Sequence, residues 1–185
     1  GVSQEELAPL IKGTNLEKYE FLDYEPIALR EKLLSTQTPR ETSPLKILID
    51  RCFAVKSVGT VALGVIKKGA VKVHDELSVF PGTKTVSIKS LQVQDEDVKQ
   101  ADSGSRVGLC FKGAEVDDLP KGSFISTSGG LISATKFKCQ ISISKFFKGG
   151  ISDGAKFMAC IGLQFVPATI RINSPIPAGG KGEVE

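Results

Sequence analysis

Hydrophobic and polar residues alternate along most of the chain after residue 44, a pattern typical of short β-strands with one buried face. Leu45, Ile47 and Ile49 begin it, and further alternations follow at 71–73, 86–93, 107–111, 137–143, 157–163 and 168–172. The alternation changes phase between Ile88 and Leu91, which predicts a β-bulge near Lys89 and Ser90. Short strands between turn signals, without a long helical pattern, indicate barrels or sandwiches.

The first 35 residues have a different pattern. Ser3 and Glu6 are spaced as a capping box before a first helix, which we expect to end at Gly13. The aromatic segment 19–24 predicts a strand, and Pro26 predicts the start of a second helix that carries Ile27 to Leu34. Two helices and one strand cannot bury much, so we expect the tail of a larger α/β domain.

The composition between these parts predicts the boundaries. Residues 35–43 contain no apolar side chain and two prolines lie at 39 and 44, which indicates a linker. Gly129–Gly130 marks a second boundary. We therefore expect a mainly β chain with two antiparallel β-barrels after a short α/β segment. Its expected parts are the α/β tail at 1–35, a linker at 36–44, a barrel at 45–128 and a truncated barrel at 129–185.

Charge and hydropathy narrow the class of protein. The formal net charge of +3 is too small to indicate nucleic-acid binding unless basic residues cluster. No run of 18 apolar residues occurs, so we expect no membrane span. The N-terminus lacks a basic-then-apolar leader, and we expect a cytoplasmic location.

Candidate catalytic and metal-binding groups are few. The four cysteines form no C-x-x-C pair and His74 is the single histidine, so we expect no metal site, buried reduced cysteines and a solvated turn around His74. The acidic run 95–97 could hold a cation, but it lacks the glycine and final glutamate of a calcium loop and fits a solvated hairpin tip.

Recognisable catalytic motifs are also lacking in the sequence. Neither G-x-x-x-x-G-K-[ST] nor G-x-S-x-G occurs, so we expect no catalytic residue and no enzyme activity in this chain itself. Two lysine pairs, Lys67 with Lys68 and Lys145 with Lys148, could contact phosphates. Exposed lysines at strand ends are equally expected for solubility.

The segment Asp50 to Leu77, DRCFAVKSVGTVALGVIKKGAVKVHDEL, resembles the second domain of translational GTPases. That domain opens with an acidic residue and a phenylalanine and continues into a G-T-V-x-x-G strand. Ser105 to Lys112, the Lys121–Gly122 turn and Thr135 to Ile143 resemble the next landmarks in order. The resemblance covers most of 45–172 and implies that the two barrels are similar to domains two and three of elongation factor EF-Tu.

Within that family, VGTVALG and KVHDEL are closest to SelB-type factors, which deliver selenocysteyl-tRNA to the ribosome. The resemblance implies a monomer that binds aminoacyl-tRNA and the ribosome. It implies no cofactor for this segment, whereas a G domain of the parent protein would bind GTP and Mg²⁺.

The resemblance also implies an aminoacyl or tRNA site made of Asp50, Arg51, Phe53 and Arg106. Selenocysteine is anionic at neutral pH, where serine and cysteine are mostly neutral. Two guanidiniums could therefore select it by charge, and Asp50 could orient one of them. The alternative is a surface ion pair between Asp50 and Arg51 with Arg106 solvated.

One departure leaves a different function open. The family's G domain ends with an S-A-K/L loop that helps hold guanine, but the equivalent stretch here, YEFLDYEP at 19–26, lacks it. The chain could instead belong to a non-GTPase paralogue with a binding or regulatory role in translation. A generic barrel that uses its lysines on RNA phosphates is the third alternative.

Overall fold

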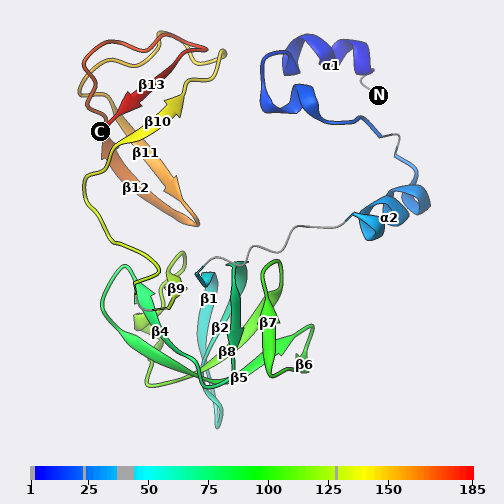
Figure 1. Ribbon diagram of the computed structural model, residues 1–185, viewed down its shortest axis with the longest axis vertical. Helices are drawn as coiled ribbons and strands as arrows, with labels where there is room; N and C mark the ends of the chain where they lie inside the picture. Colours follow the sequence, from blue (N-terminus) through cyan, green and yellow to red (C-terminus); the bar gives the residue numbers. More distant parts are fainter. Residues whose placement is uncertain (1–2, 23, 37–43, 128) are drawn as a thin grey trace. The chain divides into compact units, whose positions relative to one another are not determined.

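The computed structural model of the chain describes residues 3–22, 24–36, 44–127 and 129–185. The chain divides into two units, Gly1–Pro39 and Arg40–Glu185, and each is described by itself. Figure 1 shows helices in the first unit and strands in the second. The predicted mainly β class is confirmed. Within the described residues, no helix is long and apolar enough to cross a membrane.

The first unit contains α1 (Gln4–Ile11), a 3₁₀ turn η1 (Asn15–Lys18) and α2 (Pro26–Ser35). The capping box is confirmed, because Ser3 Oγ accepts from the Glu6 amide at 3.3 Å and Glu6 Oε2 accepts from the Ser3 amide at 2.7 Å. Pro26 does start α2. The strand prediction for 19–24 is wrong, because the described residues of that segment form no strand. The described part of the first unit contains no other strand with which it could pair. No residue of the three elements is buried.

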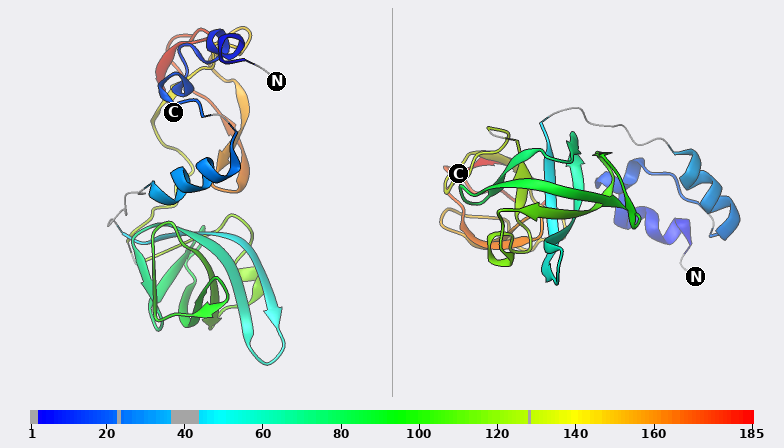
Figure 2. Two further views of the ribbon diagram at one scale, coloured as in Figure 1. Left: turned by 90° about the vertical axis from the view of Figure 1, so that its right-hand side faces the viewer. Right: turned by 90° about the horizontal axis from the view of Figure 1, so that it is seen from below.

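The first barrel is a ring of six antiparallel strands in the order β4–β9–β1–β2–β8–β5, closed by a pairing of β5 with β4. The ring strands are β1 (Lys46–Val55), β2 (Gly59–Lys68), β4 (Glu76–Phe80), β5 (Thr85–Val93), β8 (Arg106–Lys112) and β9 (Phe124–Ser126). Closure removes the free edges that an open sheet would present. Figure 2 shows the β1–β2 hairpin (cyan) projecting from one end of this ring.

Short elements complete the first barrel. A two-residue strand β6 (Glu96–Asp97) pairs with the end of β5, and β3 (Ala70–Lys72) pairs with β7 (Gln100–Asp102) as a separate ribbon. A 3₁₀ turn, η2 (Val116–Asp118), precedes β9. The acidic run 95–97 lies at the β5–β6 hairpin tip, as predicted, and Asp95 has a positive φ of 65°.

Alternate side chains of the ring strands fill the barrel. The predicted inward residues Ile47, Ile49 and Leu109 are fully buried. Register shifts between Ile88 and Ser90, which confirms the predicted bulge. A second shift, between Ile49 and Arg51, was not predicted and leaves Asp50 without a partner on β2.

The remaining strands of the second unit form two hydrogen-bonded ribbons rather than a closed ring. β10 (Cys139–Ser142) pairs with β13 (Lys181–Val184), and β11 (Lys156–Ile161) pairs with β12 (Gln164–Thr169). We refer to residues 129–185 as the ribbon region. Its small core contains Ile143, Ile151, Ile176 and Val184. β13 was not predicted, because a glycine-rich sequence gives no alternation of apolar residues.

Candidate functional site

The β1 bulge sets the position of Asp50. Because the register shifts between Ile49 and Arg51, Asp50 is the extra residue, and its carboxylate is free of the β1–β2 ladder. Asp50 Oδ1 lies 3.8 Å from Nζ of Lys121. The expected pairing of Asp50 with a guanidinium is therefore replaced by an ion pair with a lysine.

Arg51 and Arg106 lie on the same outer face of the barrel. Arg51 is opposite Leu63 on β2, and Leu63 is opposite Gly108 on β8. Arg106 precedes Gly108 by two residues and so shares its face, because side chains two apart along a strand point the same way. Both arginines are exposed, and neither guanidinium has an ion-pair partner among the described residues.

A shallow strip of small and apolar groups separates the two arginines. Leu63 is 36% exposed. A Cβ built on Gly108 would lie 3.8 Å from Leu63 Cδ2 and 3.7 Å from Gln92 Cβ, so Gly108 leaves a low point between these side chains. Gln92 is held by a hydrogen bond from its Nε2 to Asp97 Oδ1 at 2.9 Å. The face thus combines two guanidiniums that have no ion-pair partner among the described residues with an exposed apolar side chain and a glycine between them.

Phe53 follows Arg51 by two residues and lies opposite Val61 on the same face. Its side chain is 37% exposed. The hairpin beyond it is fixed by Lys89, whose Nζ donates to Val58 O at 2.9 Å, and by Cys110, whose Sγ lies 3.7 Å from the same oxygen. Phe53 is therefore available for stacking or apolar contact.

Lys67 and Lys68 lie at the far end of β2, and both are exposed. Lys67 shares the outer face with Leu63, four residues earlier, whereas Lys68 is opposite Lys46 on β1. Nζ of Lys46 lies 4.5 Å from the centre of the Phe124 ring. The structure thus adds Lys46 to the predicted pair.

Sequence reasoning did not assign Lys121, Leu63, Gly108 or Gln92 to the site. The Lys121–Gly122 turn was recognised only as a landmark, and the other three become neighbours of the arginines only through strand register. The turn is fixed on the bulge, because the Gly122 amide donates to Ile49 O at 2.8 Å and the Ile49 amide donates to Ser123 O at 2.9 Å. No local sequence signal reports such pairings.

The cysteine predictions need one correction. Cys110 is buried and Cys52 and Cys139 are partly buried, but Cys160 is exposed on the two-stranded β11–β12 ribbon. Burial raises the pKa of the Cys52 thiol, although a hydrogen bond with the Phe53 backbone opposes the shift. His74 has a φ of 75° between β3 and β4, which confirms the predicted turn.

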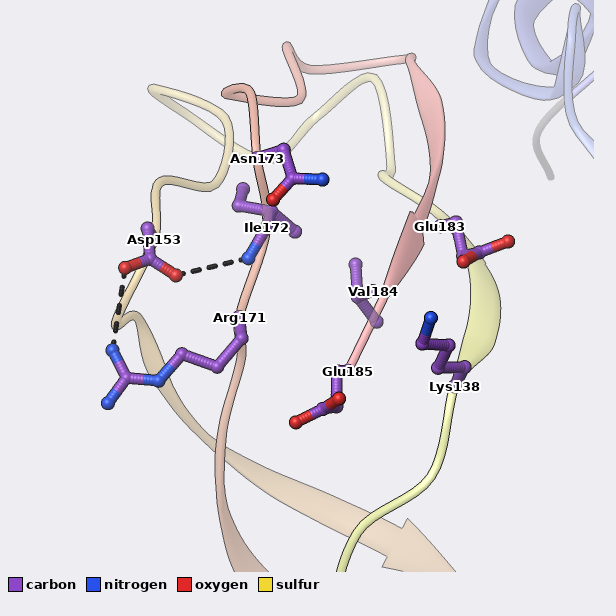
Figure 3. A pocket seen from close by; sticks show the side chains of 8 residues that line it. All are labelled: Lys138, Asp153, Arg171, Ile172, Asn173, Glu183, Val184 and Glu185. Carbon is purple, nitrogen blue, oxygen red and sulfur yellow. Dashed lines mark hydrogen bonds and ion pairs between the residues drawn. The ribbon is translucent and has the colours of Figure 1, made fainter.

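A separate hollow of about 370 Å³ lies in the ribbon region (Figure 3). On one side, Asp153 accepts from the Ile172 amide at 3.1 Å and contacts Arg171 Nη1 at 3.4 Å. On the other side, Glu185 pairs with Lys136 at 2.8 Å, and this lysine lowers the pKa of the Glu185 carboxyl. Most of its charges are thus already paired, and none of the predicted site residues lines it.

Comparison with known proteins connects the barrel to a family. The family model for elongation factor Tu domain 2 matches residues 59–126, which run from β2 to the end of β9. This segment is therefore similar to elongation factor Tu domain 2. The match includes Arg106 and Lys121, and begins just after Asp50, Arg51 and Phe53.

Two relatives come from Methanocaldococcus jannaschii. The chain is 36% identical over 165 residues to the uncharacterized protein MJ0325, covering 89% of this chain and 53% of that protein. It is 38% identical over 129 residues to a selenocysteine-specific elongation factor, covering 69% of this chain and 28% of that factor. The chain thus spans about half or less of the length of these relatives.

Solved structures agree with this relationship. The apo form of elongation factor SelB from Methanococcus maripaludis aligns at a TM-score of 0.69 and 25% identity over 85% of this chain and 38% of that one. A bacterial selenocysteine-specific factor, EF-Sec, aligns at 0.74 over 98% of this chain and 31% of that one, at 20% identity, which supports the fold alone. The predicted resemblance of the chain to SelB-type factors of the EF-Tu family is confirmed.

Proposed function

We propose that this chain is the aminoacyl-tRNA-binding part of a SelB-like elongation factor, with the outer face of β1, β2 and β8 as the aminoacyl site. The observation that supports it most is the placement of Arg51 and Arg106 on one face, without ion-pair partners among the described residues. Unneutralised guanidiniums beside a partly apolar surface favour an anionic group. A selenolate is such a group, whereas the hydroxyl of serine is not.

In this proposal the residues have separate roles. Arg51 and Arg106 attract the selenolate, and Leu63 and Phe53 provide apolar contact for the aminoacyl end. Gly108 keeps the surface low between them. Lys67 and Lys68, with Lys46, would contact RNA phosphates, and their contribution would weaken as salt rises.

The proposal extends to the parent protein only as an expectation. No stretch of the 185 residues matches a phosphate-binding loop, so GTP and Mg²⁺ would be bound by other parts of a longer protein. We propose that such a protein acts as a monomer in the cytoplasm and binds aminoacyl-tRNA and the ribosome. This segment contributes recognition rather than hydrolysis.

The test is the affinity of the protein for selenocysteyl-tRNA and seryl-tRNA, measured by protection of the ester bond from hydrolysis. Arg106→Ala should weaken selenocysteyl-tRNA binding roughly 10- to 100-fold, the size of a lost hydrogen bond to a charged group. Seryl-tRNA binding should change much less. Arg30→Ala removes the same charge from α2 and is the matched control. Equal affinity of the Arg106→Ala and native proteins for selenocysteyl-tRNA would refute the site.

A second candidate function is a paralogue that no longer uses GTP. The observation that favours it is that the match to MJ0325 covers 89% of the chain, whereas the match to the selenocysteine-specific factor covers 69%. The stretch 19–26 also lacks the guanine-loop sequence. Titration of the full-length protein with a fluorescent guanine nucleotide separates the two. Micromolar binding supports the GTPase, and no binding at millimolar nucleotide supports the paralogue.

A further inference from the structure

The tip of the β11–β12 hairpin lies against the end of the barrel that contains the candidate site. A Cβ built on Gly162, in this tip, would lie 2.7 Å from Phe124 Cζ and 2.9 Å from Leu48 Cδ1. Leu48 and Phe124 are opposite each other on β1 and β9. The backbone of the tip is therefore in direct contact with side chains of β1 and β9. The Asp50 bulge lies in β1, and β9 follows the Lys121 turn.

The same tip also touches the Lys121–Gly122 turn. A Cβ on Gly122 would lie 3.0 Å from the Gln164 amide nitrogen and 3.1 Å from the Leu163 carbonyl carbon. On its other side Gly122 donates its amide hydrogen to Ile49 O. The turn is thus held between the β1 bulge and the hairpin tip, and the close backbone atoms of the tip leave no room for a side chain at Gly122.

The turn determines which cation is beside Asp50. Lys121 and Asp50 are 66% and 43% exposed, so their ion pair contributes little to stability. The ion pair instead affects the electrostatic potential of the candidate aminoacyl site. While Asp50 faces Lys121, its carboxylate does not neutralise the neighbouring Arg51. A displaced Lys121 would leave Asp50 to pair with an arginine and reduce the positive potential for an anionic ligand.

We propose that the β11–β12 hairpin tip is a positioning element of the aminoacyl site, which acts through the Lys121–Gly122 turn to keep Asp50 away from Arg51 and Arg106. The role in ligand selection rests on the proposed function. The structural part of the proposal, that the tip holds the turn against the bulge, is independent of the proposed function. The tip residues touch no ligand in this proposal and determine the position of charges only.

The variant Gly162→Asn separates the tip from the barrel while retaining the turn. Gly162 has a φ of 63°, and asparagine is among the side chains that adopt this conformation most readily. Its Cβ would lie 2.7 Å from Phe124 Cζ and 2.9 Å from Leu48 Cδ1, so these side chains or the tip must shift. Gly154→Asn is the matched control, because Gly154 has a φ of 76° in the same region and a Cβ there meets only Arg171 Nη1, at 3.7 Å.

The first measurement is hydrogen exchange in the whole chain without ligand. In Gly162→Asn the amides of Gly122 and Ile49 should exchange roughly tenfold faster or more, since forcing a methyl-sized group into a filled contact is disruptive. The Gly154→Asn protein should keep the native rates, and β8 amides should be unchanged in both proteins. Unchanged exchange at Gly122 and Ile49 in Gly162→Asn would overturn the proposal.

The second measurement is the preference for selenocysteyl-tRNA over seryl-tRNA. It should fall roughly threefold or more in Gly162→Asn and in Lys121→Ala, with no further fall in the double variant, because both changes act on one interaction. A double variant whose loss is the product of the two single losses would refute action through Lys121. If the native chain binds no aminoacyl-tRNA, the proposed function fails, and the exchange result alone decides whether the tip holds the turn.

Discussion

The barrel and the ribbon region both consist of antiparallel strands, but they bury very different amounts of apolar surface. Seventeen described residues form the barrel core, and many are fully inaccessible. Four form the core of the ribbon region, each retaining 6–8% of its exposure. Meanwhile Met158 and Phe165 on β11 and β12 are 60% and 70% exposed. Ring closure accounts for the difference, because it places every inward side chain of six strands in one volume.

This difference indicates which part can present a rigid site. The candidate site lies on strands that are paired on both sides and backed by the large core. Each ribbon has two strands and shares a core of only four buried residues, so we expect the ribbons to open locally at a lower free energy. At the Gly162 tip they lie directly against the barrel strands beside the site.

The largest expected effect comes from the cores. Leu109→Ala should lower the free energy of unfolding by about 3–5 kcal/mol, because Leu109 is fully buried in the ring. Ile176→Ala should cost about 2 kcal/mol, since Ile176 retains some exposure in a smaller core. The chain contains no tryptophan for fluorescence. Urea unfolding followed by far-ultraviolet circular dichroism therefore measures both free energies. Equal losses would show that the two cores are packed alike.

Two glycines distinguish the interior of the barrel from its outer face. A Cβ on Gly64 would lie 2.7 Å from the Leu48 carbonyl oxygen, so Gly64→Ala should cost about 1–3 kcal/mol. Gly108→Ala meets only ordinary contacts and should change stability by less than about 0.5 kcal/mol. The same stability measurement applies. A destabilised Gly108→Ala protein would mean that the low strip between the arginines is a packed surface.

The η2 turn tests how much surface charge adds to the barrel. The Glu115 amide donates to Asp118 Oδ2 at 2.8 Å, and this bond and Lys84 lower the pKa of the Asp118 carboxyl below its usual 3.8. Its contribution to stability is therefore present above pH 3.8 and is lost as the pH falls through the lower folded-state pKa. Asp118→Asn should be less stable than the native protein at pH 7.

This loss should shrink in acid. Thermal unfolding of both proteins between pH 7 and pH 2 provides the measurement. If the difference between the two midpoints stayed constant down to pH 2, the carboxylate would not be the stabilising group.

The smallest effect is chemical and leaves the fold unchanged. Cys160 is exposed in the ribbon region, whereas Cys110 is buried in the barrel and burial raises the pKa of Cys52. Thiolates are the reactive form, so iodoacetamide at neutral pH should modify Cys160 before Cys52 and Cys110. Peptide mass spectrometry over time gives the order. Early labelling of Cys52 would indicate that the barrel opens as readily as the ribbons.

Local patterns in the sequence were sufficient for much of the fold. Alternation identified the inward residues of β1, β5 and β8, and a phase change located the bulge at Lys89–Ser90. The capping box and Pro26 identified the helix starts. These features depend on neighbours within a few residues, which is why they can be read from the chain. The described residues of 19–24 form no strand, because aromatic content favours a strand only where a partner strand exists.

The resemblance to SelB-type factors supplied Asp50, Arg51, Phe53 and Arg106 as a candidate site, and the sequence could not show how they meet. Strand register placed the two arginines on one face, with Leu63 and Gly108 between them. An unpredicted bulge released Asp50, and a turn about 70 residues further along the chain supplied Lys121 as its partner. Such pairings depend on barrel closure and on contacts between distant segments, so only the tertiary structure decided them.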